Sequence, residues 1–120
     1  MAAGGGSNQD VAVAVQVELS GAESAFGDLL PSEVYERTWR MLVPRNDTPS
    51  LPSLFEHAWS VGDEDMTQPE TLTSFLDWAQ AAVPARHHAP IVWDHGGGWS
   101  GIAIDDGSGH GNSDFMSLVC

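Results

Sequence analysis

A run of alternating valines dominates the first part of the chain. The apolar side chains at positions 11, 13, 15, 17 and 19 are separated by Ala12, Ala14, Gln16 and Glu18. Because the first half of this run is apolar on both faces, it predicts an inner β-strand over 11–19 that is covered by helices. The segment from Thr38 to Val43 predicts a second, more exposed strand, and the turn-forming residues of 21–31 and 46–52 predict loops.

The spacing of apolar residues in 68–83 is that of an amphipathic helix. The repeat places Leu72, Phe75, Leu76, Ala79 and Val83 on one face. Thr67 followed three residues later by Glu70 has the pattern of a capping box, which puts the N-cap at Thr67. Pro84 then ends the helix.

The short apolar run 89–93 predicts another strand, so helix and strand together look like half of a βαβ crossover. The predicted fold class is therefore α/β with a mainly parallel sheet, in which 11–19 and 89–94 run parallel. His95 would then lie just past the carboxyl edge of that sheet. A further short strand is predicted within 101–105, and a loop from Asp106 onward.

The charge of the chain limits its partners. Seventeen acidic residues face four arginines and no lysine, which gives a formal net charge of −13. Such a surface repels nucleic acid and anionic membranes, so neither is expected as a partner. It is compatible with a cationic substrate, although solubility is the simpler explanation of the acidity.

Termini and cysteine content add three expectations. Residues 1–10 are predicted to form a flexible tail and 11–120 the folded part; the first residues lack the features of a signal peptide. No apolar stretch reaches the length of a membrane span. Cys120, the single cysteine, excludes an internal disulfide and any multi-cysteine metal site.

The candidate chemistry lies in Trp93-Asp94-His95-Gly96-Gly97-Gly98-Trp99. An imidazole titrates near neutrality and can move a proton between a nucleophile and a leaving group. A glycine after it allows positive φ and the close approach of a substrate chain. His95 is therefore the candidate catalytic residue. The other histidines, His57, His87, His88 and His110, have no ligand-like spacing and are predicted to lie on the surface.

From Val11 to about Ser108 the chain resembles the clostripain family of cysteine peptidases, which share the caspase-like fold. The resemblance is carried, in the family's order, by 11–19, 37–43, Met66 with 69–72 and 75–79, 84–99 and 101–106. It implies a caspase-like three-layer sandwich and an endopeptidase that cleaves peptide or protein substrates after arginine or lysine. It also implies that His95 is the catalytic histidine and that the Gly96 N–H helps to bind the oxyanion.

The chain departs from the family in two respects. The nucleophilic cysteine should follow a later inner strand, and in the related caspases it lies roughly 50 residues after the histidine. Cys120 is too near His95 and is not assigned that role. The family's first inner strand, which precedes 11–19, is missing as well. We therefore expect a partial peptidase domain, incomplete at both ends and inactive by itself.

Alternatives stay open at two points. The chain could be a non-catalytic, caspase-like interaction module, that is, a pseudoenzyme. Asp105 and Asp106 are weak candidates for a calcium site, since calcium prefers oxygen ligands, but Asp-Asp-Gly-Ser-Gly lacks EF-hand spacing and a turn-stabilising role is favoured. No other cofactor is expected. Members of the family are often secreted, whereas the sequence gives neither localisation nor oligomeric state.

Overall fold

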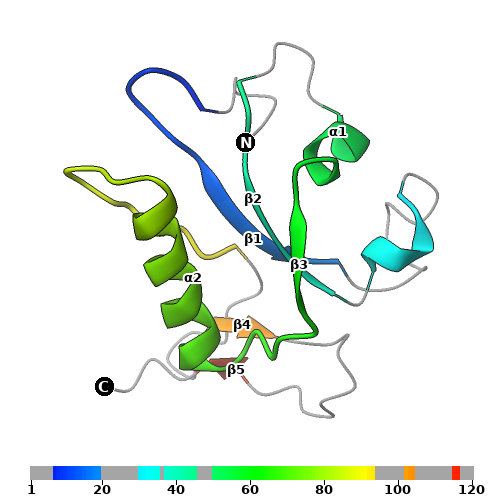
Figure 1. Cartoon of the computed structure of the whole chain (residues 1–120). Helices are drawn as coiled ribbons and strands as arrows, with labels where there is room; N and C mark the ends of the chain where they lie inside the picture. Colours follow the sequence, from blue (N-terminus) through cyan, green and yellow to red (C-terminus); the bar gives the residue numbers. More distant parts are fainter. Residues whose placement is uncertain are drawn as a thin grey trace. The chain divides into compact units, whose positions relative to one another are not determined.

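The structure is a computed structural model that describes residues 7–19, 30–35, 37–45, 50–93, 102–104 and 115–116. The chain divides into two compact units, residues 1–63 and 64–120. The elements of the first unit are strands β1 (Ala14–Glu18), β2 (Thr38–Leu42) and β3 (Trp59–Gly62), helix α1 (Leu51–Phe55) and a 3-10 turn (Ser32–Val34) (Figure 1). The second unit holds helix α2 (Pro69–Ala82) and strands β4 (Ile102–Ile104) and β5 (Phe115–Met116).

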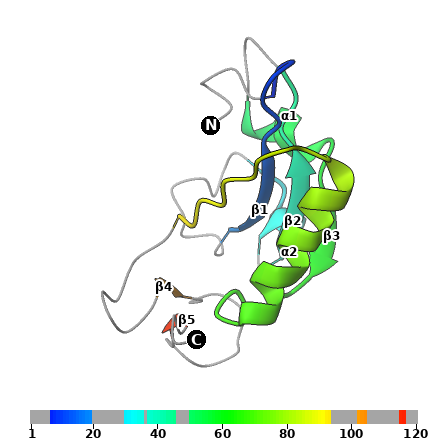
Figure 2. The same cartoon turned by 90° about the vertical axis from the view of Figure 1, so that its left-hand side faces the viewer.

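The first unit is built on a three-stranded antiparallel sheet with the order β1-β2-β3 (Figure 2). Gln16 pairs with Arg40 across the β1–β2 ladder, and Trp39 pairs with Ser60 across the β2–β3 ladder. A register irregularity lies between Thr38 and Trp39 on the second ladder. Each strand is thus bonded to the next strand in the chain, an arrangement that needs no crossover helix.

The prediction of a mainly parallel sheet is therefore wrong. Residues 14–18 run antiparallel to β2, and residues 89–93 belong to none of the strands that the structure describes. The caspase-like three-layer sandwich requires that parallel sheet, so this prediction is wrong as well. The physical reason is that apolar alternation records which faces of a strand are buried, whereas strand direction depends on which segment becomes its neighbour.

The relative burial of the first two strands was also predicted the wrong way round. β1 is an edge strand whose residues are only partly buried. β2 is the central strand, with Thr38 fully buried and Met41 and the following Val43 nearly so. Thr38 and Arg40 on one face of β2 and Met41 on the other are all buried, so both faces of this strand are covered.

One face of this sheet carries the small core of the first unit. Leu30, Val34 and Tyr35 form the core, and Leu19, Trp39 and Phe55 pack against it. The rings of Trp39 and Phe55 meet edge to face, with centroids 5.8 Å apart and an interplanar angle of 87°. The indole Nε1 of Trp39 also donates a hydrogen bond of 2.8 Å to the Val34 carbonyl oxygen. Trp39 therefore links the central strand to the turn that precedes it.

Two features of the first unit were not anticipated from the sequence. Helix α1 begins within the segment 46–52 that was predicted to be a loop, and its N-cap Ser50 forms a capping box with Ser53. β3 follows directly, and Gly62 at its end has φ 113°. A five-residue helix and a four-residue strand are too short to produce a clear periodic signal.

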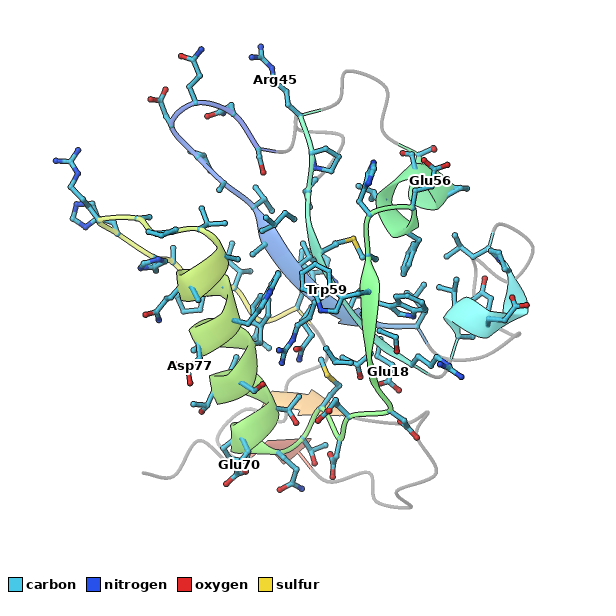
Figure 3. The ribbon with its side chains drawn as sticks, viewed as in Figure 1. Glu18, Arg45, Glu56, Trp59, Glu70 and Asp77 are labelled. Atoms are coloured by element: carbon cyan, nitrogen blue, oxygen red, sulfur yellow. The ribbon has the colours of Figure 1, made fainter. Side chains whose placement is uncertain are left out.

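Helix α2 confirms the helix predicted over 68–83, with observed bounds Pro69–Ala82. The predicted capping box is wrong, because the N-cap is Gln68 and its side chain makes no capping bond. The hydroxyl of Thr67 donates to Asp65 Oδ1 instead. Glu70 and Asp77 mark the first turn and the middle of this helix in Figure 3.

β4 confirms the short strand predicted within 101–105, and it pairs antiparallel with β5. The sequence predicts a loop from Asp106 onward. Phe115 and Met116 form a strand, so that prediction is wrong at these two positions.

Candidate functional site

The predicted catalytic pair, His95 and Gly96, lies outside the residues that the structure describes, and so do Asp105, Asp106 and Cys120. The described chain leads to Trp93, two residues before the histidine. The structure describes three features of the chain that leads to this histidine: helix α2, the hydrogen bonds at the start of that helix, and the exposed segment 84–93 that follows it.

Asp65 organises the start of α2. Its carboxylate accepts hydrogen bonds from the Thr67 N–H at 2.9 Å and from Gln68 Nε2 at 2.9 Å. Its backbone carbonyl accepts from the Thr71 hydroxyl at 2.8 Å, and Thr71 is buried. Thr67 precedes the N-cap Gln68, so these bonds fix the turn that leads into α2 rather than capping its N–H groups. The negative carboxylate near the start of the helix also complements the helix dipole.

The segment that follows α2 is exposed along its whole length. The last helical bond of α2 runs from the Val83 N–H to the Ala79 carbonyl at 2.9 Å, and Pro84 comes next. Residues 84–93, drawn in yellow tones in Figure 2, have no helix or strand, and every one of them is exposed. The strand predicted over 89–93 is therefore wrong. Ile91 is 76% and Trp93 94% exposed.

The same segment differs in charge from the rest of the chain. Acidic residues number 17 in the sequence, yet none lies between Asp77 and Asp94. Arg86, His87 and His88 stand together within this stretch, and all three are exposed. His57, His87 and His88 are exposed as the sequence predicted. A substrate or partner approaching along 84–93 therefore meets apolar and basic groups rather than carboxylates.

A polar cluster in the first unit was not picked out by sequence reasoning. Arg40 is only 8% exposed, and its Nε donates a 2.8 Å hydrogen bond to Gln16 Oε1. On the same face, the Thr38 hydroxyl donates to Glu18 Oε2 at 3.1 Å. The sequence signal that could have identified this cluster is Arg40, an arginine within the otherwise largely apolar strand segment 38–43. With each of these groups engaged by a cross-strand neighbour, the cluster fixes the β1–β2 register rather than offering a reactive group.

No group of three or more histidine, cysteine, aspartate or glutamate side chains in the described part of the chain could hold a metal ion. Among the helices that the structure describes, none has the length and apolar character needed to cross a bilayer.

Comparison of the chain with protein-family models, with curated proteins and with solved structures found no match.

Proposed function

We propose that this chain is the histidine-bearing portion of a cysteine endopeptidase resembling the clostripain family, which cleaves after arginine or lysine. The observation that supports it best is the motif Trp93-Asp94-His95-Gly96, which follows a segment that is exposed over 84–93. An accessible approach is what a histidine acting on a peptide chain needs.

The proposed chemistry assigns one task to each group. A cysteine thiolate, from a residue other than Cys120, attacks the scissile carbonyl carbon and forms a C–S bond. The Gly96 N–H stabilises the oxyanion, and the His95 imidazolium donates its proton to the amine as the C–N bond breaks. Water, with its proton taken by His95, then hydrolyses the thioester and releases the carboxylic acid and the thiol.

An arginine or lysine preference also fits the charge of the chain. A formal charge of −13 attracts cationic peptides, and this field raises their rate of encounter with the protein. The attraction falls as salt increases. The preference itself comes from the resemblance, because a pocket for the basic side chain would need residues other than those named so far.

A second candidate is a non-catalytic interaction module. The observation that favours it is the exposure of three consecutive apolar residues, Ile91, Val92 and Trp93, since such patches are often binding surfaces. The two candidates differ in one requirement. The peptidase needs a cysteine nucleophile that depends on His95, whereas the module needs neither.

Fluorogenic arginine and lysine peptides distinguish them. We expect no turnover by this chain alone. We expect turnover by the protein extended at both ends, which restores the first inner strand and adds a cysteine after an apolar strand within roughly 60 codons downstream. In the extended protein His95→Ala should abolish turnover. His87→Ala is the matched control, an exposed histidine eight positions earlier, and should leave it unchanged. Turnover that survives His95→Ala, or a following sequence without such a cysteine, contradicts the proposal.

A further inference from the structure

The loop that follows α2 carries an arginine on a stretch of chain that is exposed throughout (Figure 1). The chain bends at Arg86, and residues 84–93 have neither helix nor strand. The last hydrogen bond of α2 is donated by the Val83 N–H, before this loop begins. Exposed loops of this kind are preferred sites of proteolysis, because an endopeptidase needs access to an unpaired backbone on both sides of the bond that it cleaves.

The other three arginines are held by the sheet of the first unit. Arg40 is 8% exposed and lies in the central strand β2. The bond after Arg37 leads to Thr38, which is fully buried and pairs with both β1 and β3. Arg45 follows Val43, which is 3% exposed and donates a 2.8 Å backbone hydrogen bond to the chain just before β1. An endopeptidase therefore reaches these three sites only after the sheet opens locally.

The distribution of charge favours the same bond. Endopeptidases that cleave after arginine or lysine bind the basic side chain in an anionic pocket, so carboxylates close to the scissile bond repel them. The chain has 17 acidic residues, and Arg37 and Arg45 each have one within two positions in the sequence. None lies between Asp77 and Asp94, and Arg86 stands in the middle of that stretch. Repulsion is therefore weakest at Arg86.

We propose that the Arg86–His87 bond is a processing site for endopeptidases that cleave after basic residues. Hydrolysis adds one water molecule as the C–N bond breaks, which leaves a carboxylate on Arg86 and a free amine on His87. The cut falls after β1, β2, β3 and α2, so the fragment 1–86 keeps these elements, and the fragment 87–120 carries the motif that contains His95. This site goes beyond the proposed peptidase activity and does not depend on it.

Limited digestion of the whole chain with trypsin, followed by mass spectrometry of the intact fragments, tests the position. Because the chain has four arginines and no lysine, each cut gives an unambiguous pair of fragments. We expect 1–86 and 87–120 to appear first, on the order of 100-fold faster than cuts at the other arginines. In urea, where the sheet is lost, this preference should fall to less than about 10-fold. A first cut at another arginine, or an undiminished preference in urea, overturns the proposal.

Substitutions at the bond separate recognition of the arginine from general fragility of the loop. Arg86→Gln should abolish the first cut and Arg86→Lys should retain it. His87→Pro turns the scissile bond into a tertiary amide without an N–H and should block the cut. His88→Pro is the matched control, since this histidine is also exposed and its substitution leaves the scissile bond unchanged. Cleavage at the same bond in Arg86→Gln, or equal rates for the two proline variants, contradicts the assignment.

Far-UV circular dichroism during the digestion tests the consequence for the fold. The ladders of β1–β3 and the helical bonds of α2 lie within residues 7–83, so their signal should survive completion of the first cut. Loss of the helical signal together with the first cut would show that these elements require the fragment 87–120, and would overturn the proposed separation.

Discussion

Trp39 is the residue whose replacement tests the first unit most directly. Its indole packs edge to face on Phe55 and donates a 2.8 Å hydrogen bond to the carbonyl of Val34, a residue only 6% exposed. Trp39→Phe keeps an aromatic ring in place but removes the donor. Loss of a hydrogen bond to a buried carbonyl costs about 1 to 3 kcal/mol. The lost apolar surface of the second ring adds about 1 kcal/mol.

The expected destabilisation is therefore about 2 to 4 kcal/mol, a large share of the stability of a small domain. Urea denaturation followed by far-UV circular dichroism measures it without relying on tryptophan emission. Trp59→Phe is the matched control, a tryptophan of the same sheet that is 42% exposed, and it should cost less than about 1 kcal/mol. A Trp39→Phe cost equal to or below that of Trp59→Phe would refute the packing described for this core.

Three further predictions follow from the hydrogen bonds and the backbone. Asp65→Ala should lower the free energy of unfolding by about 1 to 2 kcal/mol and weaken amide-exchange protection in the first turn of α2. Glu70→Ala should lower it by only a few tenths of a kcal/mol. A larger loss for Glu70→Ala than for Asp65→Ala would mean that the predicted capping box does form. Gly62→Ala should cost about 1 to 2 kcal/mol through its φ of 113° alone, because no atom lies within 4 Å of an added Cβ; a neutral result in thermal melts would contradict that conformation. A double-mutant cycle of Gln16→Ala and Arg40→Lys should give a coupling energy of about 0.5 to 1.5 kcal/mol, and additivity would mean that their hydrogen bond contributes nothing.

Side-chain periodicity predicts α2, β1 and β2 close to their observed positions, although it wrongly predicts a strand over 89–93. The helical repeat that ends at Pro84 corresponds to α2 within a residue or two at each end, and the segments 11–19 and 38–43 contain β1 and β2. These elements are set by side-chain periodicity and by proline, which act over a few residues. The N-cap was misplaced because Thr67 bonds to Asp65, and this competition among nearby polar side chains leaves no periodic trace.

Sheet direction and strand order could not be obtained in the same way. The valine run around Val15 looks like an inner strand, but it lies at an edge, while the strand containing Thr38 and Arg40 is central and buries both. Burial of these polar groups is stabilised by partners on β1 that are 20 and 24 residues away in the sequence. Pairing over such separations is decided by the folded chain as a whole, so a single segment does not reveal it.

The candidate site was inferred from a sequence motif, not from side-chain periodicity. His95 and Gly96 were identified from residue types and from a resemblance, and the structure adds only the exposed, acid-free approach that ends at Trp93. Exposure of that approach could not be predicted, because the same apolar run fits a buried strand equally well.

The central claim is that His95 activates a cysteine other than Cys120, and affinity labelling measures this directly. The extended protein is treated with an acyloxymethyl ketone carrying arginine, and the modified residue is located by mass spectrometry. We predict a thioether on one cysteine beyond Cys120, labelled far more slowly in His95→Ala and at the original rate in His87→Ala. Labelling at Cys120, no labelled cysteine, or a rate unaffected by His95→Ala would contradict the claim.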